Sequence, residues 1–259
     1  MFERARITLL LGSLAAILAT SEAPGVKAAP STGDPKAVAV ADKVMTALGG
    51  QKAWDKTRFI RFDFAVERDG KSLVSRAHTW DKWNGRYRLE GVTKEGDPYV
   101  VLMNLNTKDG NAWKKGKKLS GDERKKELED AFAAWTNDTY WLLMPYKLHD
   151  AGCNLAMAGE EKKGGKVWDK LLLTFDNVGL TPKDKYWVYV NRETGLVDRW
   201  DFVLKGENKP KSTFTWEGWK SYGKIQLANN HVSTKDKVRI YHPVLDTPAV
   251  VADAVFTKP

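Results

Sequence analysis

The 259-residue sequence contains no pattern that is diagnostic of catalysis. It lacks a Gly-x-Ser-x-Gly nucleophile elbow, a glycine-rich nucleotide loop and a His-Glu-x-x-His metal motif. One cysteine and four scattered histidines are a poor basis for a structural zinc site. We therefore expect no catalytic residues, no metal ligands and no cofactor, and a protein that is not an enzyme.

A few single residues have the chemistry of an active site but lack its geometry. His149 and Asp150 are adjacent, and sequence neighbours seldom come within the hydrogen-bond distance that a catalytic pair needs. His78 and Asp81 stand three apart in an expected strand, so their side chains should point to opposite faces. Cys153 has no evident activating base, which indicates a buried structural cysteine.

The densest charge cluster is basic. It consists of Lys114, Lys115, Lys117, Lys118, Arg124, Lys125 and Lys126. One interpretation is a solvated hairpin tip and an exposed helix face. The other is docking of Lys114, Lys115, Lys117 and Lys118 to an anionic membrane surface.

The N-terminus has the organisation of a signal peptide. Arg4 and Arg6 precede an apolar run, Ile7–Ala19, and Val26-Lys27-Ala28 is a small-x-small cleavage site. The run is shorter than the roughly 20 residues that span a membrane. We expect residues 1–28 to be removed and residues 29–259 to form a single domain. The alternatives are cleavage at Ala19 or Ala23, or an uncleaved anchor. The protein would be exported to the periplasm of a Gram-negative-type bacterium, with secretion as the second choice.

Export and composition narrow the class of partner. The net charge of +9 favours binding to anionic surfaces. Arg86-Tyr87-Arg88 interleaves basic and aromatic residues, as single-stranded nucleic-acid sites do, but an exported protein is a poor candidate for nucleic-acid binding. With a single cysteine no intrachain disulfide can form. The core must come from apolar burial, which eleven Trp, nine Phe and eight Tyr can supply.

Periodicity predicts one helix followed by a strand meander. Asp34 and Pro35 begin an amphipathic helix that Gly49-Gly50 ends. After it the apolar period changes to two. The strands expected in the first half are Ile60–Glu67, Ser72–Trp83, Arg86–Gly91, Tyr99–Leu105 and one around Trp113. Asp69-Gly70 and Asn84-Gly85 supply the hairpin turns.

Strands return in the second half of the chain. We expect Cys153–Glu160, Lys166–Phe175, Lys185–Asn191, Leu196–Lys205, Ser212–Trp219, Lys224–Leu227, His231–Tyr241 and Val250–Phe256. From these segments we expect one continuous antiparallel meander of about eleven strands, and sheets of that width curl or close. The fold class is mainly β with a few helices.

A helical insert separates the two meanders. Leu128, Phe132 and Trp135 mark the apolar stripe of a helix. A separate short apolar turn, Tyr140–Met144, follows, with Asn137 or Asp138 as its cap and Pro145 as its end. Such an apolar turn must be buried, and the concave face of the curved sheet is its natural partner.

The order of these segments resembles the bacterial lipoprotein-localisation carrier superfamily (LolA-like), and most closely a group of exported bacterial proteins of that fold. The resemblance rests on Ala47–Gly50, Trp80–Arg88, Tyr140–Asp150 and Thr174–Pro182. It implies an open, strongly curved antiparallel half-barrel whose concave face is plugged by helices. Its better-known relatives carry or sense the acyl chains of lipoproteins. The resemblance also implies a cavity arginine, for which Arg61, Arg76, Arg86 and Arg88 are all candidates by strand position.

The sequence thus predicts a monomeric periplasmic carrier or binding protein for a hydrophobic ligand such as an acyl chain, a lipid or a lipoprotein. The expected ligand-binding residues are Phe62, Phe64, Trp80, Tyr87 and Leu89 from the sheet, and Tyr140, Trp141, Leu143 and Met144 from the lid. The alternative is an envelope sensor or interaction module whose plug is permanent core and which binds no ligand. A hydrolase is the third and weakest hypothesis.

Overall fold

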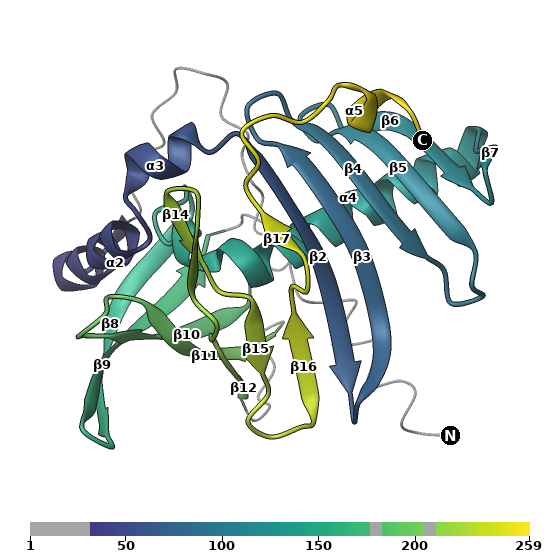
Figure 1. Ribbon diagram of the computed structural model, residues 1–259. Helices are drawn as coiled ribbons and strands as arrows, with labels where there is room; N and C mark the ends of the chain where they lie inside the picture. The colour runs from purple at the N-terminus through teal and green to yellow at the C-terminus, as the bar shows by residue number, and fades with distance from the viewer. Residues whose placement is uncertain (1–31, 177–182, 205–210) are drawn as a thin grey trace. The chain divides into compact units, whose positions relative to one another are not determined.

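The computed structural model describes residues 32–176, 183–204 and 211–259 (Figure 1). The expected signal peptide, residues 1–28, and the segment Asn177–Pro182 lie outside this part of the chain. The chain divides into two compact units, each built around its own sheet. Unit 1 comprises residues 1–47 and 139–215, and unit 2 comprises residues 48–138 and 216–259.

Unit 1 is a six-stranded sheet in the order β1-β8-β9-β10-β11-β12. Its strands are β1 (Thr32–Gly33), β8 (Cys153–Lys163), β9 (Lys166–Phe175), β10 (Lys185–Asn191), β11 (Val197–Val203) and β12 (Ser212–Thr215). All neighbours pair antiparallel except β1, which runs parallel to β8.

Helix α2 (Pro35–Ala47) belongs to unit 1 and begins as the sequence predicts. The Asp34 Oδ1 atom accepts a hydrogen bond from the Lys36 amide at 2.9 Å, and Pro35 fills the first helical position. Its buried residues, Ala37, Val40, Ala41 and Val44, share one face. Gly49, at φ 109°, ends the segment in a conformation that glycine adopts without strain.

Unit 2 is a nine-stranded antiparallel sheet accompanied by a two-stranded ribbon. The large sheet has the order β15-β16-β2-β3-β4-β5-β6-β7, with β17 also paired to β2. Its strands are β2 (Phe59–Arg68), β3 (Lys71–Asp81), β4 (Arg86–Val92), β5 (Pro98–Asn104), β6 (Asp109–Lys114), β7 (Lys117–Lys118), β15 (Asn230–Val232), β16 (Val238–Tyr241) and β17 (Leu245–Asp246). The ribbon is β13 (Lys220–Tyr222) with β14 (Ile225–Leu227). The edge strands β7 and β15 do not pair, so the curved sheet does not close into a barrel (Figure 1).

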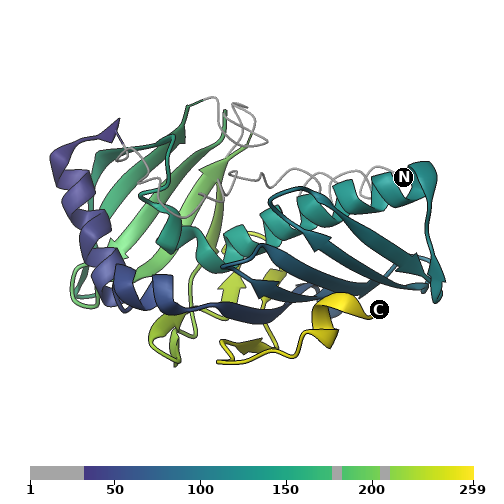
Figure 2. The same cartoon turned by 90° about the horizontal axis from the view of Figure 1, so that it is seen from above.

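The strands of this sheet have two chemically different faces. We call the face of Phe62, Phe64, His78 and Leu89 the inner face, and the opposite face the outer face. Successive side chains along a strand point to opposite faces, so the neighbouring Arg61 is exposed while Phe62 is fully buried. Figure 2 shows helix α4 on one face of these strands and the short helix α5 (Ala254–Thr257) on the other.

The helical insert differs from the sequence prediction. Helix α4 is continuous from Gly121 to Leu143, and a 3₁₀ turn, η1 (Met144–Lys147), follows it. The expectation of a separate Tyr140–Met144 turn capped by Asn137 or Asp138 is wrong. Both residues lie inside the helix, because the Asp138 carboxylate has partners on strand β3 that outweigh its preference for a cap.

Three strand expectations also need correction. Val250–Phe256 is not a strand: it is an irregular segment that leads into α5. His231–Tyr241 is divided into β15 and β16 by a turn, and Trp216–Trp219 lies beyond the end of β12. The strands are therefore shorter than expected, and the described residues contain more than eleven of them. They form separate sheets instead of one continuous meander. The expected mainly antiparallel, open, curved β architecture with a few helices is confirmed.

Candidate functional site

The five expected ligand-binding residues of the sheet form one patch on the inner face of unit 2. Pairing places Phe62 opposite His78 and His78 opposite Leu89, while Trp80 lies opposite Tyr87. Phe62 and Phe64 are 0 % exposed, and even Trp80, the most accessible of the five, is only 9 % exposed. The structure thus brings together the sheet residues that the sequence singled out.

The first five turns of α4, from Gly121 to Asp138, belong to unit 2 and cover this inner face. The indole of Trp135 meets that of Trp80 edge-on, with ring centroids 5.4 Å apart. Leu128, Ala131 and Trp135 are the buried apolar residues of this part of α4, and they recur at helical spacing. An aromatic sheet face is therefore covered by a helix that contributes a narrow apolar stripe.

A buried polar cluster joins the same helix to the sheet. Arg76 on β3 donates from Nε and Nη2 to the two carboxylate oxygens of Asp138, both at 2.7 Å. The Asp138 side chain is fully buried, whereas that of Arg76 is 21 % exposed. Burial opposes ionisation of Asp138, but the Arg76 charge and the hydrogen bond from His78 keep its pKa below the usual value.

His78 extends the cluster to strand β4. Its Nε2 atom lies 3.1 Å from Asp138 Oδ2, and its Nδ1 atom lies 2.8 Å from the Tyr87 hydroxyl. Burial lowers the pKa of His78, although Asp138 acts in the opposite sense, so the ring is neutral. A neutral ring satisfies both contacts if the Tyr87 hydroxyl donates to Nδ1 and Nε2–H donates to Asp138.

The cluster has the connectivity of a proton relay but holds no reactive group. Burial raises the pKa of Tyr87 well above its usual value, so the phenol stays protonated and is a poor nucleophile. The Phe62 ring stacks on His78 with centroids 4.3 Å apart, which closes one side of the imidazole. The geometry suits a polar anchor that fixes α4 to the sheet.

The four candidate cavity arginines lie on different faces of the sheet. Only Arg76 faces the covered inner face of the sheet. Arg61 and Arg88 face outward, and Arg86 donates to Asp81 and Asp253 on the outer side. Burial would raise the pKa of Asp81, but hydrogen bonds from Arg58, Arg86 and Asn84 lower it to about 2.

The four expected lid residues lie in unit 1. Tyr140, Trp141, Leu143 and Met144 are at most 1 % exposed. Trp141 packs edge-on against Trp200 and Phe214, with ring centroids 4.8 and 4.9 Å apart. The last turn of α4 therefore lies against the aromatic face of the unit 1 sheet. The nine expected residues thus form two buried groups, one in each unit.

Comparison with solved structures finds similar proteins at low sequence identity. A DUF1329 family protein from Desulfovibrio piger matches at 16% identity and a TM-score of 0.48, over 85% of this chain and 96% of that one. A LolA superfamily protein from Nitrosomonas europaea matches at 13% identity and a TM-score of 0.48, over 86% and 97%. The second of these matches is thus a LolA superfamily protein, similar in fold at low sequence identity. No family model and no curated protein matches the sequence.

The basic cluster is partly neutralised. Lys114 Nζ lies 3.3 Å from Glu127, and Lys115 Nζ lies 2.9 Å from Asp97. Lys117 and Lys118 form the exposed edge strand β7, and Lys118 lies 5.8 Å from the Trp113 ring centroid. Of the four lysines expected at a membrane, the last two are the more available for an anionic surface.

The single residues that have catalytic chemistry are placed as structural groups. His149 Nε2 lies 3.1 Å from Asp42, while Asp150 pairs with Lys147 at 2.8 Å, so the adjacent His and Asp have different partners. Cys153 is buried, and burial raises the pKa of its thiol to about 12. Within the described ranges no group of three His, Cys, Asp or Glu side chains is placed to hold a metal ion. No helix among the described residues is long and apolar enough to cross a membrane.

Sequence reasoning missed Asp138 and its link to His78. The available signal was its position, because Leu128, Ala131, Trp135 and Asp138 continue one helical stripe at steps of three or four. A carboxylate on the apolar stripe of a helix indicates a buried partner. The local Asn-Asp pattern instead favours a helix cap.

Proposed function

We propose that this protein is an exported carrier or binding protein for a hydrophobic ligand such as an acyl chain or lipid, without catalytic turnover. The observation that carries the proposal is the cover of the inner face in unit 2. A patch of five aromatic and aliphatic sheet residues is buried under a helix that inserts Leu128, Ala131 and Trp135 and is otherwise largely polar. Such a cover can be exchanged for an apolar ligand of similar area.

The energetics of this exchange favour transfer over storage. Burial stabilises by about 25 cal/mol per Å² of apolar surface, whether the partner is a helix or an acyl chain. Ligand binding would replace contacts of Trp135 with contacts of the ligand, so the net affinity is the difference between two similar quantities. A carrier that must release its ligand to an acceptor needs such a small difference.

One experiment tests whether the protein binds a lipid and whether Trp135 limits that binding. Native mass spectrometry of the protein purified from its own envelope should show a bound lipid, and a fluorescent fatty acid should bind the emptied protein. Trp135→Ala removes the anchor opposite Trp80, so the probe should bind more tightly. Trp83→Ala is the matched control, because Trp83 is 57 % exposed outside the covered patch.

The results separate the proposal from its rivals. An empty protein that ignores the probe, with Trp135→Ala behaving like Trp83→Ala, would exclude the carrier function. Hydrolysis of generic ester substrates by the purified protein would instead support an enzyme.

A second candidate function is a sensor or interaction module with a permanently closed inner face. The observation that favours it is the Arg76–Asp138 pair, whose two 2.7 Å hydrogen bonds fix α4 to β3. Opening α4 would separate two charges that are complementary only while they are in contact. Under this function the fatty acid would not bind, and Trp135→Ala would reduce stability without any gain in binding.

A further inference from the structure

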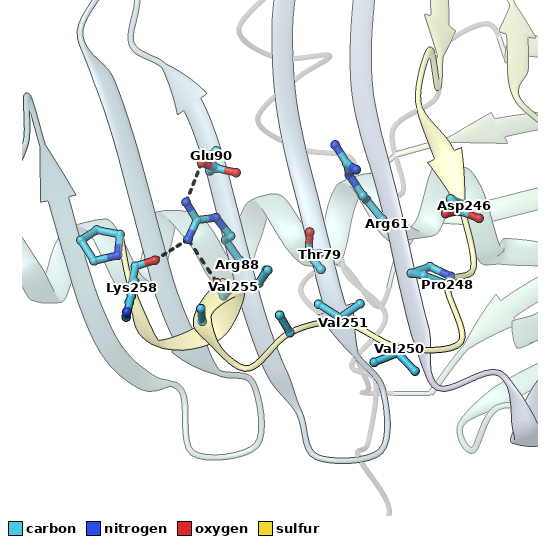
Figure 3. Close-up of a pocket in the computed structure, with 13 residues that line it drawn as sticks. Arg61, Thr79, Arg88, Glu90, Asp246, Pro248, Val250, Val251, Val255 and Lys258 are labelled. Carbon is cyan, nitrogen blue, oxygen red and sulfur yellow. Dashed lines mark hydrogen bonds and ion pairs between the residues drawn. The ribbon is translucent and has the colours of Figure 1, made fainter.

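The outer face of the unit 2 sheet carries a pocket of about 610 Å³ that α4 does not touch. Strands β2, β3 and β4 form its floor, and the C-terminal segment Asp246–Pro259 forms its wall (Figure 3). Its volume is in the range of about 300–1,000 Å³ that small-molecule sites occupy. This pocket lies on the opposite side of the sheet from the site proposed above, so it does not require α4 to move.

Four polar side chains form one row across the pocket. Strand pairing sets Asp246 opposite Arg61, Arg61 opposite Thr79 and Thr79 opposite Arg88. Neighbouring strands are about 4.8 Å apart, which separates the backbones of the two arginines by roughly 10 Å. The row therefore presents two guanidinium groups around a central hydroxyl.

Arg88 binds the wall and is paired with Glu90 on its own strand. Its Nη1 atom donates to the carbonyl oxygens of Lys258 at 2.7 Å and Val255 at 3.1 Å, and its Nη2 atom donates to Glu90 at 2.7 Å. Arg86 adds an ion pair to Asp253 at 2.6 Å. The wall is thus fixed before any ligand arrives, and the charge of Glu90 is already compensated.

Arg61 is chemically different from Arg88. It forms no hydrogen bond or ion pair with any residue in the described ranges, and its side chain is exposed to the pocket (Figure 3). The wall of the same pocket includes Val251 and Val250, and Val250 is 81 % exposed. A pocket that holds both a guanidinium without a hydrogen-bonded partner and uncovered aliphatic groups is complementary to a molecule with an anionic head and an apolar body.

The charge balance favours a monoanion. The lining side chains carry three positive charges, on Arg61, Arg88 and Lys258, and two negative charges, on Glu90 and Asp246. A planar carboxylate matches the fork of a single guanidinium with two parallel hydrogen bonds. A phosphate dianion would place its second charge near the Asp246 carboxylate, which lies opposite Arg61, and this disfavours it.

We propose that this outer pocket binds a small aliphatic carboxylate, with the carboxylate on Arg61 and the hydrocarbon chain against Val250 and Val251. The probe is octanoate, titrated into the full chain and followed by amide chemical shifts. Shifts should concentrate at Thr79, Val250 and Val251. Octanol and octyl phosphate, titrated in the same way, test the need for charge and for a single charge.

Two variants make the test specific. Arg61→Gln should weaken octanoate binding about tenfold, which corresponds to one charge-assisted pair of hydrogen bonds. Arg68→Gln removes the same charge from the same strand outside the pocket and should leave binding unchanged. Both are surface substitutions and should leave folding intact.

Several results would overturn the assignment. These are a lack of octanoate binding, shifts away from Val250, or equal effects of the two arginine variants. Octanol or octyl phosphate that binds as tightly as octanoate would exclude the carboxylate as the recognised group. Trp135→Ala should leave the shifts at Val250 unchanged, so failure here is distinguishable from failure of the carrier function.

Discussion

Arg76 and Asp138 are 62 residues apart in the chain and are joined by two hydrogen bonds of 2.7 Å. The pair connects strand β3 to the interior of helix α4. It explains how a charged residue can occupy the buried stripe of that helix, since both carboxylate oxygens are satisfied. It also adds to the energy that any opening of α4 in unit 2 must overcome.

Removing one member of this pair should be more damaging than removing both. Arg76→Gln leaves the Asp138 charge buried without its partner, and we expect the free energy of unfolding at pH 7 to fall by about 3 kcal/mol or more. The double variant Arg76→Gln/Asp138→Asn removes the uncompensated charge and should lose less than the sum of the single variants. Urea denaturation of all four proteins measures the coupling. Additive losses would show that the pair does not anchor α4.

His242 should make the protein sensitive to mild acid. Burial lowers its pKa to about 4, while in the unfolded chain it has the ordinary value of about 6.5. Between these values the unfolded chain binds a proton that the folded protein does not. His242 therefore does not reduce the free energy of unfolding above pH 6.5. As the pH falls from 6.5 towards 4, this group lowers the free energy of unfolding by about 3 kcal/mol.

The variant His242→Gln tests this dependence. It loses the hydrogen bond from Nδ1 to the Asp63 carbonyl oxygen, so it should be less stable at pH 7. Its unfolding free energy should nevertheless change less between pH 6.5 and 4 than that of the parent. A parental slope in His242→Gln would assign the acid sensitivity to another group, such as the buried His78.

The sequence anticipated the regular parts of the fold because local chemistry determines them. Asp34 and Pro35 begin a helix, and Asn84-Gly85 makes a hairpin with Gly85 at φ 67°. The alternation around Phe62 separated an inner from an outer face, and the inner aromatic patch followed from it. These features depend on residues close together in the chain.

The parts that sequence reasoning missed depend on distant partners. Asn137-Asp138 has the composition of a cap, but Arg76 retains Asp138 inside the helix. Val250–Phe256 has the composition of a strand, but Arg88 binds carbonyl groups at its end and at Lys258, and keeps it off the sheet edge. In both places a tertiary contact of an arginine outweighs local preference.

Lys117 and Lys118 should carry most of any attraction to an anionic membrane surface. Lys114 and Lys115 already have carboxylate partners, whereas strand β7 is exposed at the edge of its sheet. We expect Lys117→Gln/Lys118→Gln to reduce binding to phosphatidylglycerol vesicles by roughly tenfold to thirtyfold, at about 1 kcal/mol per charge. Lys125→Gln/Lys126→Gln removes the same charge from α4 and serves as the control. Equal effects of the two pairs would indicate attraction by net charge alone.

Substitution of Trp141 tests whether the last turn of α4 is a lid or part of the permanent core. In unit 1 its indole is 1 % exposed and contacts Trp200 and Phe214, so Trp141→Ala should reduce the free energy of unfolding by about 3–5 kcal/mol. If this turn is a lid, the same change weakens its competition with a ligand, and a fluorescent fatty acid should bind more tightly. Trp187→Ala, on the opposite face of β10, is the matched control and should not improve binding. A loss of stability without tighter binding would mean that the turn is permanent core, and that a carrier function would have to use the inner face of unit 2.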